Sequence, residues 1–248
     1  MYRGVYTAAM GMLVDLTKID TVSNNLANVE TNGYRADTPV FRTYLEREIL
    51  RLKPEPENKR LEVRRIGRLE QAVILDEVRT VFDQGTLEFT GVRTHLAISG
   101  EGFFVIRRGG QVLYTRNGEF LVDQSGRLVT TQGHFVLDVN GNEIVFPENA
   151  YIDETGAVRD LNGNILTRIA IYNLENPRKI GDAFFTGTQT QAGDFRILQG
   201  YIEKSNVNAV REMVRLIDAH RHYEATSKAI VVHDELLNKI INNVGALR

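Results

Sequence analysis

The chain has 248 residues, 42% of them hydrophobic, so it can bury a core, and disorder throughout is excluded. Its 30 basic and 32 acidic residues give a formal net charge of −2, which predicts no nucleic-acid partner. The absence of cysteine excludes disulfides, thiol catalysis and thiolate metal sites. No segment reaches the roughly 20 apolar residues of a membrane span, so we expect no direct membrane insertion. The start of the chain lacks the pattern of a cleaved secretory signal, so we expect any export to proceed without cleavage.

The first predicted element is a helix over residues 6–28. Its apolar residues recur at helical spacing and form one stripe, with the heptad positions Val5, Met12, Ile19 and Leu26. Asparagine is a poor helix former, and glycine readily adopts the left-handed conformation that ends a helix. The helix should therefore end between Asn28 and Gly33, after an asparagine cluster that comprises Asn24, Asn25 and Asn28.

Residues 35–60 are expected to connect this helix to the next part of the chain. Within them, residues 46–52 have the composition of a short helical piece. Residues 53–59 are polar and contain two prolines, which remove backbone donors and restrict the preceding residue. We therefore predict an exposed linker or loop there.

Residues 61–198 read as short antiparallel strands separated by turns. Regularly spaced glycines divide runs rich in Val, Ile, Phe, Thr and Tyr, the residues that favour strands. Residues 103–106 and 112–115 flank Gly109-Gly110 in the pattern of a hairpin. Asn-Gly pairs predict further turns, and two Asp-x-x-Gly segments indicate recurrent turn chemistry rather than a repeat. These turns are expected at Asn117-Gly118, Asn140-Gly141, Asn162-Gly163, Asp123–Gly126 and Asp153–Gly156.

A second long helix is predicted from Ser205 or Asn206, as the N-cap, to about Val244. At 1.5 Å per residue it would extend roughly 60 Å. Its heptad stripe is Leu216, Tyr223, Ile230, Leu237 and Val244, and an earlier stripe at residues 207, 210, 214 and 217 drifts into it. Polar residues interrupt this pattern, so we expect multi-helix packing rather than a regular two-stranded coiled coil. Because neither terminal stripe has an assigned partner, we expect both helices to be mobile before assembly.

These elements define a fold class: mainly β with terminal helices (α+β). An antiparallel β-domain is flanked by N- and C-terminal helices that pack as a coiled-coil-like layer. The expected domains are an N-terminal helical assembly segment (1–34), a connecting segment (35–60), the β-domain (61–198) and a C-terminal helical assembly segment (199–248).

No constellation of residues predicts catalysis, a cofactor or a metal ion. The five histidines lack the spacing of a His-Glu-x-x-His site or any other regular ligand pattern. Ser99 lacks the flanking glycines of a nucleophile elbow, and Gly100-Glu101-Gly102 has no third glycine opening a helix. We therefore expect a protein that is not an enzyme.

Several motifs, taken together in chain order, resemble the bacterial flagellar rod and hook protein family. The segment Ser23–Arg35 (SNNLANVETNGYR) is similar to the N-terminal signature of that family. The resemblance continues through residues 96–104 (LAISGEGFF), 114–120 (YTRNGEF) and 123–129 (DQSGRLV), then 203–207 (EKSNV) and Arg221, Tyr223, Glu224, Ser227, Lys228 and Asp234. One departure is Val92–His95, where many relatives carry Asn-Pro-Leu-Asp, which puts the local turn in question.

The resemblance implies a structural subunit of the flagellar basal-body rod, similar in length to the distal rod subunit or its proximal relative. Such a subunit is exported by the flagellar type III apparatus and polymerises helically in the periplasm into a hollow drive shaft that transmits torque to the hook. Its partners would be copies of itself and other rod and hook proteins. The assembly interface would include the two stripes, Asn24, Asn25, Asn28 and Gly33, with Arg221 and Glu224 as weaker contact candidates.

Plainer explanations exist for the same residues. The asparagine cluster can simply satisfy free backbone groups at a helix end, and Tyr223 can simply pack. If the amides also hold subunits in register, Asn25→Ala should impair assembly more than monomer stability. The alternative function is a β-domain that binds a glycan or another ligand, or acts in adhesion, and is oligomerised by its helices.

Overall fold

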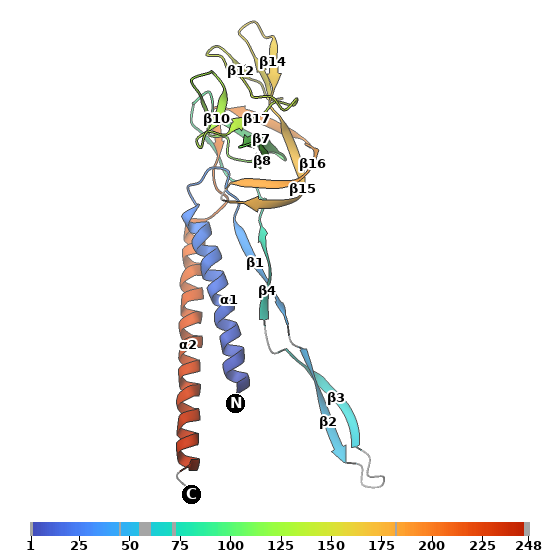
Figure 1. Cartoon of the computed structure of the whole chain (residues 1–248), viewed down its shortest axis with the longest axis vertical. Helices are drawn as coiled ribbons and strands as arrows, with labels where there is room; N and C mark the ends of the chain where they lie inside the picture. The colour runs from blue at the N-terminus through green and yellow to red at the C-terminus, as the bar shows by residue number, and fades with distance from the viewer. Residues whose placement is uncertain (1, 45, 55–60, 71–72, 182, 246–248) are drawn as a thin grey trace. The chain divides into compact units, whose positions relative to one another are not determined.

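The computed structural model describes residues 2–44, 46–54, 61–70, 73–181 and 183–245 (Figure 1). These residues form two helices and eighteen strands, so the predicted mainly-β α+β class is confirmed. The chain divides into two compact units. The helical unit comprises Met1–Asn24, Asp37–Arg79 and Val210–Arg248, and the β unit comprises Asn25–Ala36 and Thr80–Ala209.

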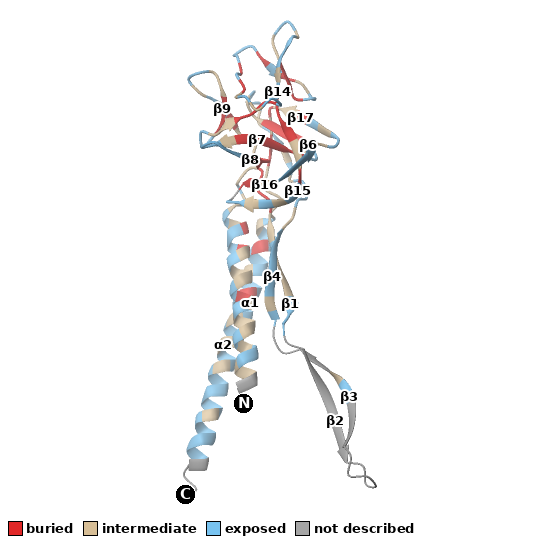
Figure 2. Ribbon diagram, turned by 45° about the vertical axis from the view of Figure 1, so that its right-hand side comes forward, coloured by how far each residue is buried: buried red, intermediate tan, exposed pale blue. Residues whose placement is uncertain are grey.

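The helical unit contains helices α1 (Tyr2–Ala27) and α2 (Ala209–Gly245), which lie side by side and run in opposite directions (Figures 1 and 2). Small residues on α1 face α2. A Cβ added at Gly4 would lie 3.1 Å from His233 Nε2, and one at Gly11 would lie 3.8 Å from Thr226 Cγ2. The two helices therefore pack against each other within one chain, and the premise that neither has a partner before assembly is wrong.

The ends of the helices differ slightly from the prediction. Helix α1 ends at Ala27, and turns follow up to Gly33. Helix α2 begins at Ala209, not at Ser205 or Asn206. Asn206 cannot serve as the N-cap because its side chain is bonded within the β unit: Oδ1 accepts the Ala36 N–H at 2.8 Å and Nδ2 donates to Val81 O at 2.9 Å.

The prediction of a short helix at residues 46–52 is wrong. These residues belong to strand β2 (Glu46–Pro54), which pairs antiparallel with β3 (Leu61–Glu70) from Glu46↔Glu70 to Pro54↔Leu61. A helix of two turns is marginal in water, whereas a ladder of this length satisfies the backbone along both strands. The adjoining strands β1 (Asp37–Thr43) and β4 (Val73–Thr80) also pair. Of the predicted loop at 53–59, Lys53 and Pro54 lie in β2, and residues 55–59 lie outside the described residues.

The β unit contains the remaining strands, and every described register in it is antiparallel. A seven-stranded sheet has the order β15-β16-β8-β7-β11-β10-β9, a three-stranded sheet has the order β12-β13-β14, and β6 pairs with β17 and β5 with β18. The strands of the large sheet are β7 (Phe103–Arg108), β8 (Gln111–Thr115), β9 (Phe120–Val122), β10 (Leu128–Thr130), β11 (Phe135–Val136), β15 (Ile171–Ile180) and β16 (Phe184–Gln191). The others are β5 (Leu87–Phe89), β6 (Leu96–Gly100), β12 (Tyr151–Ile152), β13 (Ala157–Arg159), β14 (Ile165–Arg168), β17 (Phe195–Gln199) and β18 (Tyr201–Glu203).

The core of this unit is apolar and aromatic. Phe104 and Phe120 meet edge to face with ring centroids 5.1 Å apart, inside a cluster that also contains Leu96, Ile98 and Ile106. The predicted hairpin is confirmed: β7 and β8 pair up to Arg108↔Gln111, and both intervening glycines have positive φ.

Recurrent Asp-x-x-Gly turns are confirmed, and the described part of the chain contains four of them rather than two. In each, the aspartate Oδ1 accepts the N–H groups two and four residues later, and the glycine N–H donates back to the aspartate carbonyl. The aspartates are Asp123, Asp138, Asp153 and Asp160. The turns expected at Asn140-Gly141 and Asn162-Gly163 are therefore present.

Asn117-Gly118 does not form the tip of a hairpin: the chain is held locally by the Asn117 Oδ1, which accepts the Glu119 N–H at 2.9 Å. The Gly118 carbonyl accepts the Leu96 N–H at 2.9 Å and the Phe120 N–H at 3.0 Å. A Cβ at this position would lie 1.5 Å from Leu96 O. Glycine is required here for close backbone approach rather than for turning the chain.

Protonation of Asp153 should lower the stability of the β unit at acid pH. Burial is the largest influence on this carboxyl and raises its pKa, but hydrogen bonds from Thr155, Arg159 and backbone N–H groups outweigh it and lower the pKa to about 2. A carboxyl with a lowered folded pKa stabilises the fold above its unfolded pKa of about 3.9, and this contribution is lost as pH falls toward 2. We expect Asp153→Asn to reduce the loss of stability between pH 4 and pH 2, measured as urea midpoints across that range. An unchanged slope in the variant would contradict this assignment.

Candidate assembly surfaces

The predicted stripe of α1 is only half-buried in the single chain. Val5, Met12, Ile19 and Leu26 are all of intermediate exposure. The most buried positions of α1 within the helical unit are instead Asp15, 6% exposed, and Val22, 7% exposed. They continue the row of Gly4 and Gly11, which faces α2. This row was missed because three of its four members, two glycines and an aspartate, carry no hydrophobic signal.

The predicted stripe of α2 shows the same pattern. Leu216, Tyr223, Ile230 and Leu237 are half-buried, while Arg221 and Glu224 are exposed. Val244 lies in α2, but its side chain is outside the described residues. The most buried positions are Glu212, 4% exposed, and Ala219, 6% exposed. Glu212 forms an ion pair with Arg215, with Oε1 and Nη1 2.6 Å apart. This pairing compensates for the burial of the carboxylate.

A cavity of about 390 Å³ lies between α1, α2 and β1, inside the helical unit. Its lining includes the apolar residues Val22, Phe41 and Ala219 together with side chains of both signs of charge. Asp15 lies 3.5 Å from Lys18 Nζ, which also lies 5.5 Å from the centre of the Phe41 ring. Within the described ranges, no group of three or more potential ligands could hold a metal ion.

Both helices leave large apolar side chains exposed to solvent in the single chain. Figure 2 shows exposed residues along most of the length of α2. Scattered exposed apolar residues are ordinary, but a concentration on two paired helices marks an interaction surface. The exposed apolar residues are Tyr6, Leu13 and Leu16 on α1, and Val210, Met213, Val214, Ile217, Val231, Val232, Leu236, Ile240 and Ile241 on α2. Neither described helix has the length and apolarity needed to cross a membrane.

The asparagine-rich segment after α1 belongs to the β unit from Asn25 onward. Asn25 is 1% exposed, and its Oδ1 accepts the Tyr34 hydroxyl at 3.1 Å. Asn28 is half-buried and accepts a hydrogen bond from Thr31 Oγ1 at 3.1 Å, whereas Asn24 is exposed. Because Asn25 is buried inside one chain, Asn25→Ala removes an internal bond, and exposed Asn24 is the better position for testing an assembly role.

Gly33 and Arg35 join this segment to a buried charge triad. Gly33 is buried with φ 70°, and its N–H donates to Glu203 O at 2.7 Å. Glu203 is fully buried: its Oε1 lies 2.6 Å from Arg35 Nη1 and its Oε2 lies 3.3 Å from Arg116 Nη1. Burial is the main cause that lowers the pKa of Arg116, to about 10, and the opposing effect of Glu203 is smaller.

The triad was not predicted from the sequence. Each of its members lies within a motif that carried the family resemblance, in Ser23–Arg35, residues 114–120 and residues 203–207. That position was the available signal, but it does not single out the triad, because each motif also contains a second charged residue: Glu30, Glu119 or Lys204. What the sequence could not show is that the three motifs meet.

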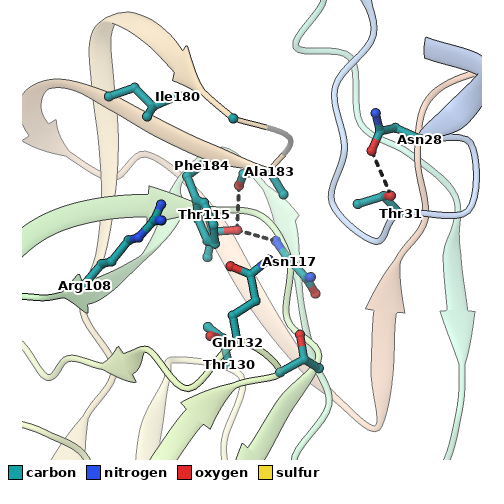
Figure 3. A pocket seen from close by; sticks show the side chains of 12 residues that line it. Asn28, Thr31, Arg108, Thr115, Asn117, Thr130, Gln132, Ile180, Ala183 and Phe184 are labelled. Carbon is teal, nitrogen blue, oxygen red and sulfur yellow. Dashed lines mark hydrogen bonds between the residues drawn. The ribbon is translucent and has the colours of Figure 1, made fainter. Parts of the chain in front are cut away.

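A second cavity, of about 410 Å³, lies inside the β unit (Figure 3). It is lined mainly by hydroxyl and amide side chains, with Arg108 as its charged residue. Thr115 Oγ1 donates to Ala183 O at 2.8 Å and accepts the Asn117 N–H at 3.0 Å, so these groups are already used within the fold. Among the described residues that line it, there is no carboxylate or histidine that could act as a base beside a hydroxyl nucleophile.

The departure at Val92–His95 still forms a turn. The His95 N–H donates to Val92 O at 3.0 Å, and His95 Nδ1 lies 2.9 Å from Thr90 Oγ1. Arg93 donates to the carbonyls of Glu148 and Ala150. These hydrogen bonds stabilise the connection.

Comparison with known proteins shows which family shares the three motifs that contain the triad. Family models match three stretches: "Flagella basal body rod protein" over residues 6–35, "Flagellar hook protein FlgE/F/G D1 domain" over 97–169, and "Flagellar basal body rod FlgEFG protein C-terminal" over 198–243. The chain is 34% identical to the flagellar basal-body rod protein FlgG of Borreliella burgdorferi, over 98% of this chain and 99% of that protein. The chain belongs to the flagellar basal-body rod protein family.

Other relatives also match this rod protein along its whole length. It is 29% identical to FlgG of Bacillus subtilis, over 98% of this chain and 99% of the relative. It is 27% identical to the flagellar hook-basal body complex protein FlhO of the same organism, over the whole of both chains. The rod protein is thus a structural component of the flagellar basal body, and the predicted main function is confirmed in preference to the ligand-binding alternative.

Proposed function

We propose that this rod protein is an FlgG-type subunit that polymerises helically into the hollow drive shaft between motor and hook. Packing between the α1–α2 pairs of neighbouring subunits would form the inner layer of that shaft. The full-length similarity to proteins named FlgG supports this type of subunit, and a proximal-rod identity is the alternative. The observation that carries the proposal is the apolar surface left exposed on the paired helices.

The physical reason for polymerisation is the cost of leaving that surface in water. Full burial of a large apolar side chain contributes about 1.5–3 kcal/mol. The buried positions of α1 and α2 already pack within the helical unit. The exposed apolar residues on α2 would therefore be covered by another chain. The predicted interface residues Arg221 and Glu224 are exposed and lie on the same helix, where they could set the register of that contact.

The partners we infer are copies of this chain, other rod and hook proteins, and the flagellar type III export apparatus during delivery. The location we infer is the periplasmic part of the basal body, reached without cleavage of a signal peptide. We assign the protein no catalytic activity, because its role is mechanical and no acid, base and nucleophile are brought together in the sites described above.

Val231→Asp tests the assembly surface. Val231 is 55% exposed, so the substitution should change the free energy of unfolding of the purified chain by no more than about 0.5 kcal/mol. In cells, the same substitution places a charge in an apolar contact, and we expect rods that end early and loss of motility. Electron microscopy of isolated basal bodies measures rod length, and chemical denaturation measures stability.

Leu161→Asp is the matched control, because it also replaces an exposed apolar residue by aspartate, at a 74% exposed position of the β unit. It should leave the rods at full length. Immunoblotting of the exported fraction separates failure of assembly from failure of export. Full-length rods in cells that export Val231→Asp would contradict the proposed role of this helix face.

A further inference from the structure

The sequence contains four Asn-Gly pairs, and the structure places them in two different environments. They are Asn32-Gly33, Asn117-Gly118, Asn140-Gly141 and Asn162-Gly163. Asn-Gly is the pair in which the asparagine side chain is most open to attack by the next backbone nitrogen, because glycine has no side chain to obstruct the approach. All four lie in the β unit, so each serves as a control for the others.

In two of the pairs the asparagine is half-buried and the glycine is buried. Asn32 Nδ2 donates to Glu119 Oε2 at 2.9 Å, and the Gly33 N–H donates to Glu203 O at 2.7 Å. Asn117 Oδ1 accepts the Glu119 N–H at 2.9 Å. Both glycines are buried and crowded: an added Cβ at Gly33 would lie 2.3 Å from Asn117 N. A ring built from either asparagine and its glycine would have to displace packed backbone.

The other two pairs lie at the tips of Asp-x-x-Gly turns. Asn140 and Asn162 are exposed, and a Cβ added to Gly141 or Gly163 would have no atom within 4 Å. The Gly141 N–H donates to Asp138 O at 2.9 Å, but this bond closes a surface turn. Such bonds break in local fluctuations that cost far less than unfolding the core.

We propose that Asn140 and Asn162 are sites of spontaneous deamidation in the folded protein, and that Asn32 and Asn117 are protected by the fold. In the first step, the glycine nitrogen bonds to the asparagine Cγ and loses its proton, while the bond from Cγ to the side-chain nitrogen breaks and ammonia leaves. Water then adds to either carbonyl of the resulting succinimide ring and opens it. The products are aspartate or isoaspartate, and the only co-reactant is water.

The modification would alter both turns in the same way. A new carboxylate would stand two residues from Asp138 or Asp160, the anions that organise the turns. Isoaspartate would also add a methylene to the main chain. That lengthening would displace the Gly141 and Gly163 carbonyls, which accept hydrogen bonds from Arg107 and Arg159 respectively.

Peptide mass spectrometry of the full chain tests the proposal. Purified protein is incubated at 37 °C and mildly alkaline pH, which favours loss of the glycine N–H proton, and is then digested at acidic pH to avoid further reaction. The gain of about one dalton is followed separately in the four Asn-Gly peptides, and isoaspartate is distinguished from aspartate by chromatography. A parallel sample in concentrated urea gives the deamidation rates of the unfolded chain.

We expect the peptides containing Asn140 and Asn162 to be modified several-fold faster than those containing Asn32 and Asn117 in the native sample. In urea the four rates should converge. Equal rates in the native protein, faster reaction at Asn32 or Asn117, or native protection of all four relative to urea would each overturn the assignment.

Discussion

Glu203→Gln is expected to lower the free energy of unfolding by about 3–5 kcal/mol, the cost of removing one partner of a buried ion pair. Glu203 is fully buried between Arg35 and Arg116, and its Oε1 also accepts the Gly85 N–H at 2.9 Å. Without the carboxylate, two buried guanidinium groups would lose the anion that both of them contact. Urea unfolding followed by tyrosine fluorescence measures the loss, since the chain has nine tyrosines and no tryptophan.

Glu88→Gln provides the control for that substitution. Glu88 is a carboxylate on β5, the strand that pairs with β18, but its side chain is 56% exposed and lies 3.7 Å from Lys204 Nζ. Exposed ion pairs contribute little, so we expect a change of no more than about 1 kcal/mol. If the two variants lost similar stability, the triad would not be a principal support of the β unit.

Gly33→Ala should destabilise the β unit by about 2–5 kcal/mol, through left-handed backbone strain together with overpacking. Gly33 has φ 70°, and an added Cβ would lie 2.3 Å from Asn117 N and 2.4 Å from the Arg116 carbonyl carbon. These are backbone atoms and cannot move as a flexible side chain would. The denaturant midpoint should fall, and the hydrogen bond from Gly33 N–H to Glu203 O should weaken with it.

Gly163→Ala separates the two causes. Gly163 has φ 82°, close to that of Gly33, but a Cβ there would meet no atom within 4 Å. The control therefore carries the backbone strain without the clash, and we expect it to cost about 1 kcal/mol. Equal losses in both variants would show that strain alone accounts for the requirement for glycine at position 33.

The local elements of this protein could be predicted because their signals are local. Helical periodicity located both terminal helices to within a few residues, and paired glycines located the β7–β8 hairpin. Two of the four aspartate turns were predicted from Asp-x-x-Gly, and the other two carry the same spacing at Asp138 and Asp160. Motif order along the chain was sufficient to indicate the family.

The sequence determined the helices, most of the turns, the fold class and the family, because each depends on neighbouring residues or on motif order. Only the tertiary structure decided that residues 46–54 form a strand, since its partner at 61–70 supplies the backbone bonds. It also decided that α2 starts at Ala209, because Asn206 is bonded to distant carbonyls. The Arg35–Glu203–Arg116 triad and the α1–α2 contact likewise join positions far apart in the chain. Such contacts depend on which surfaces the folded chain brings within hydrogen-bonding or packing distance, and no local pattern encodes that proximity.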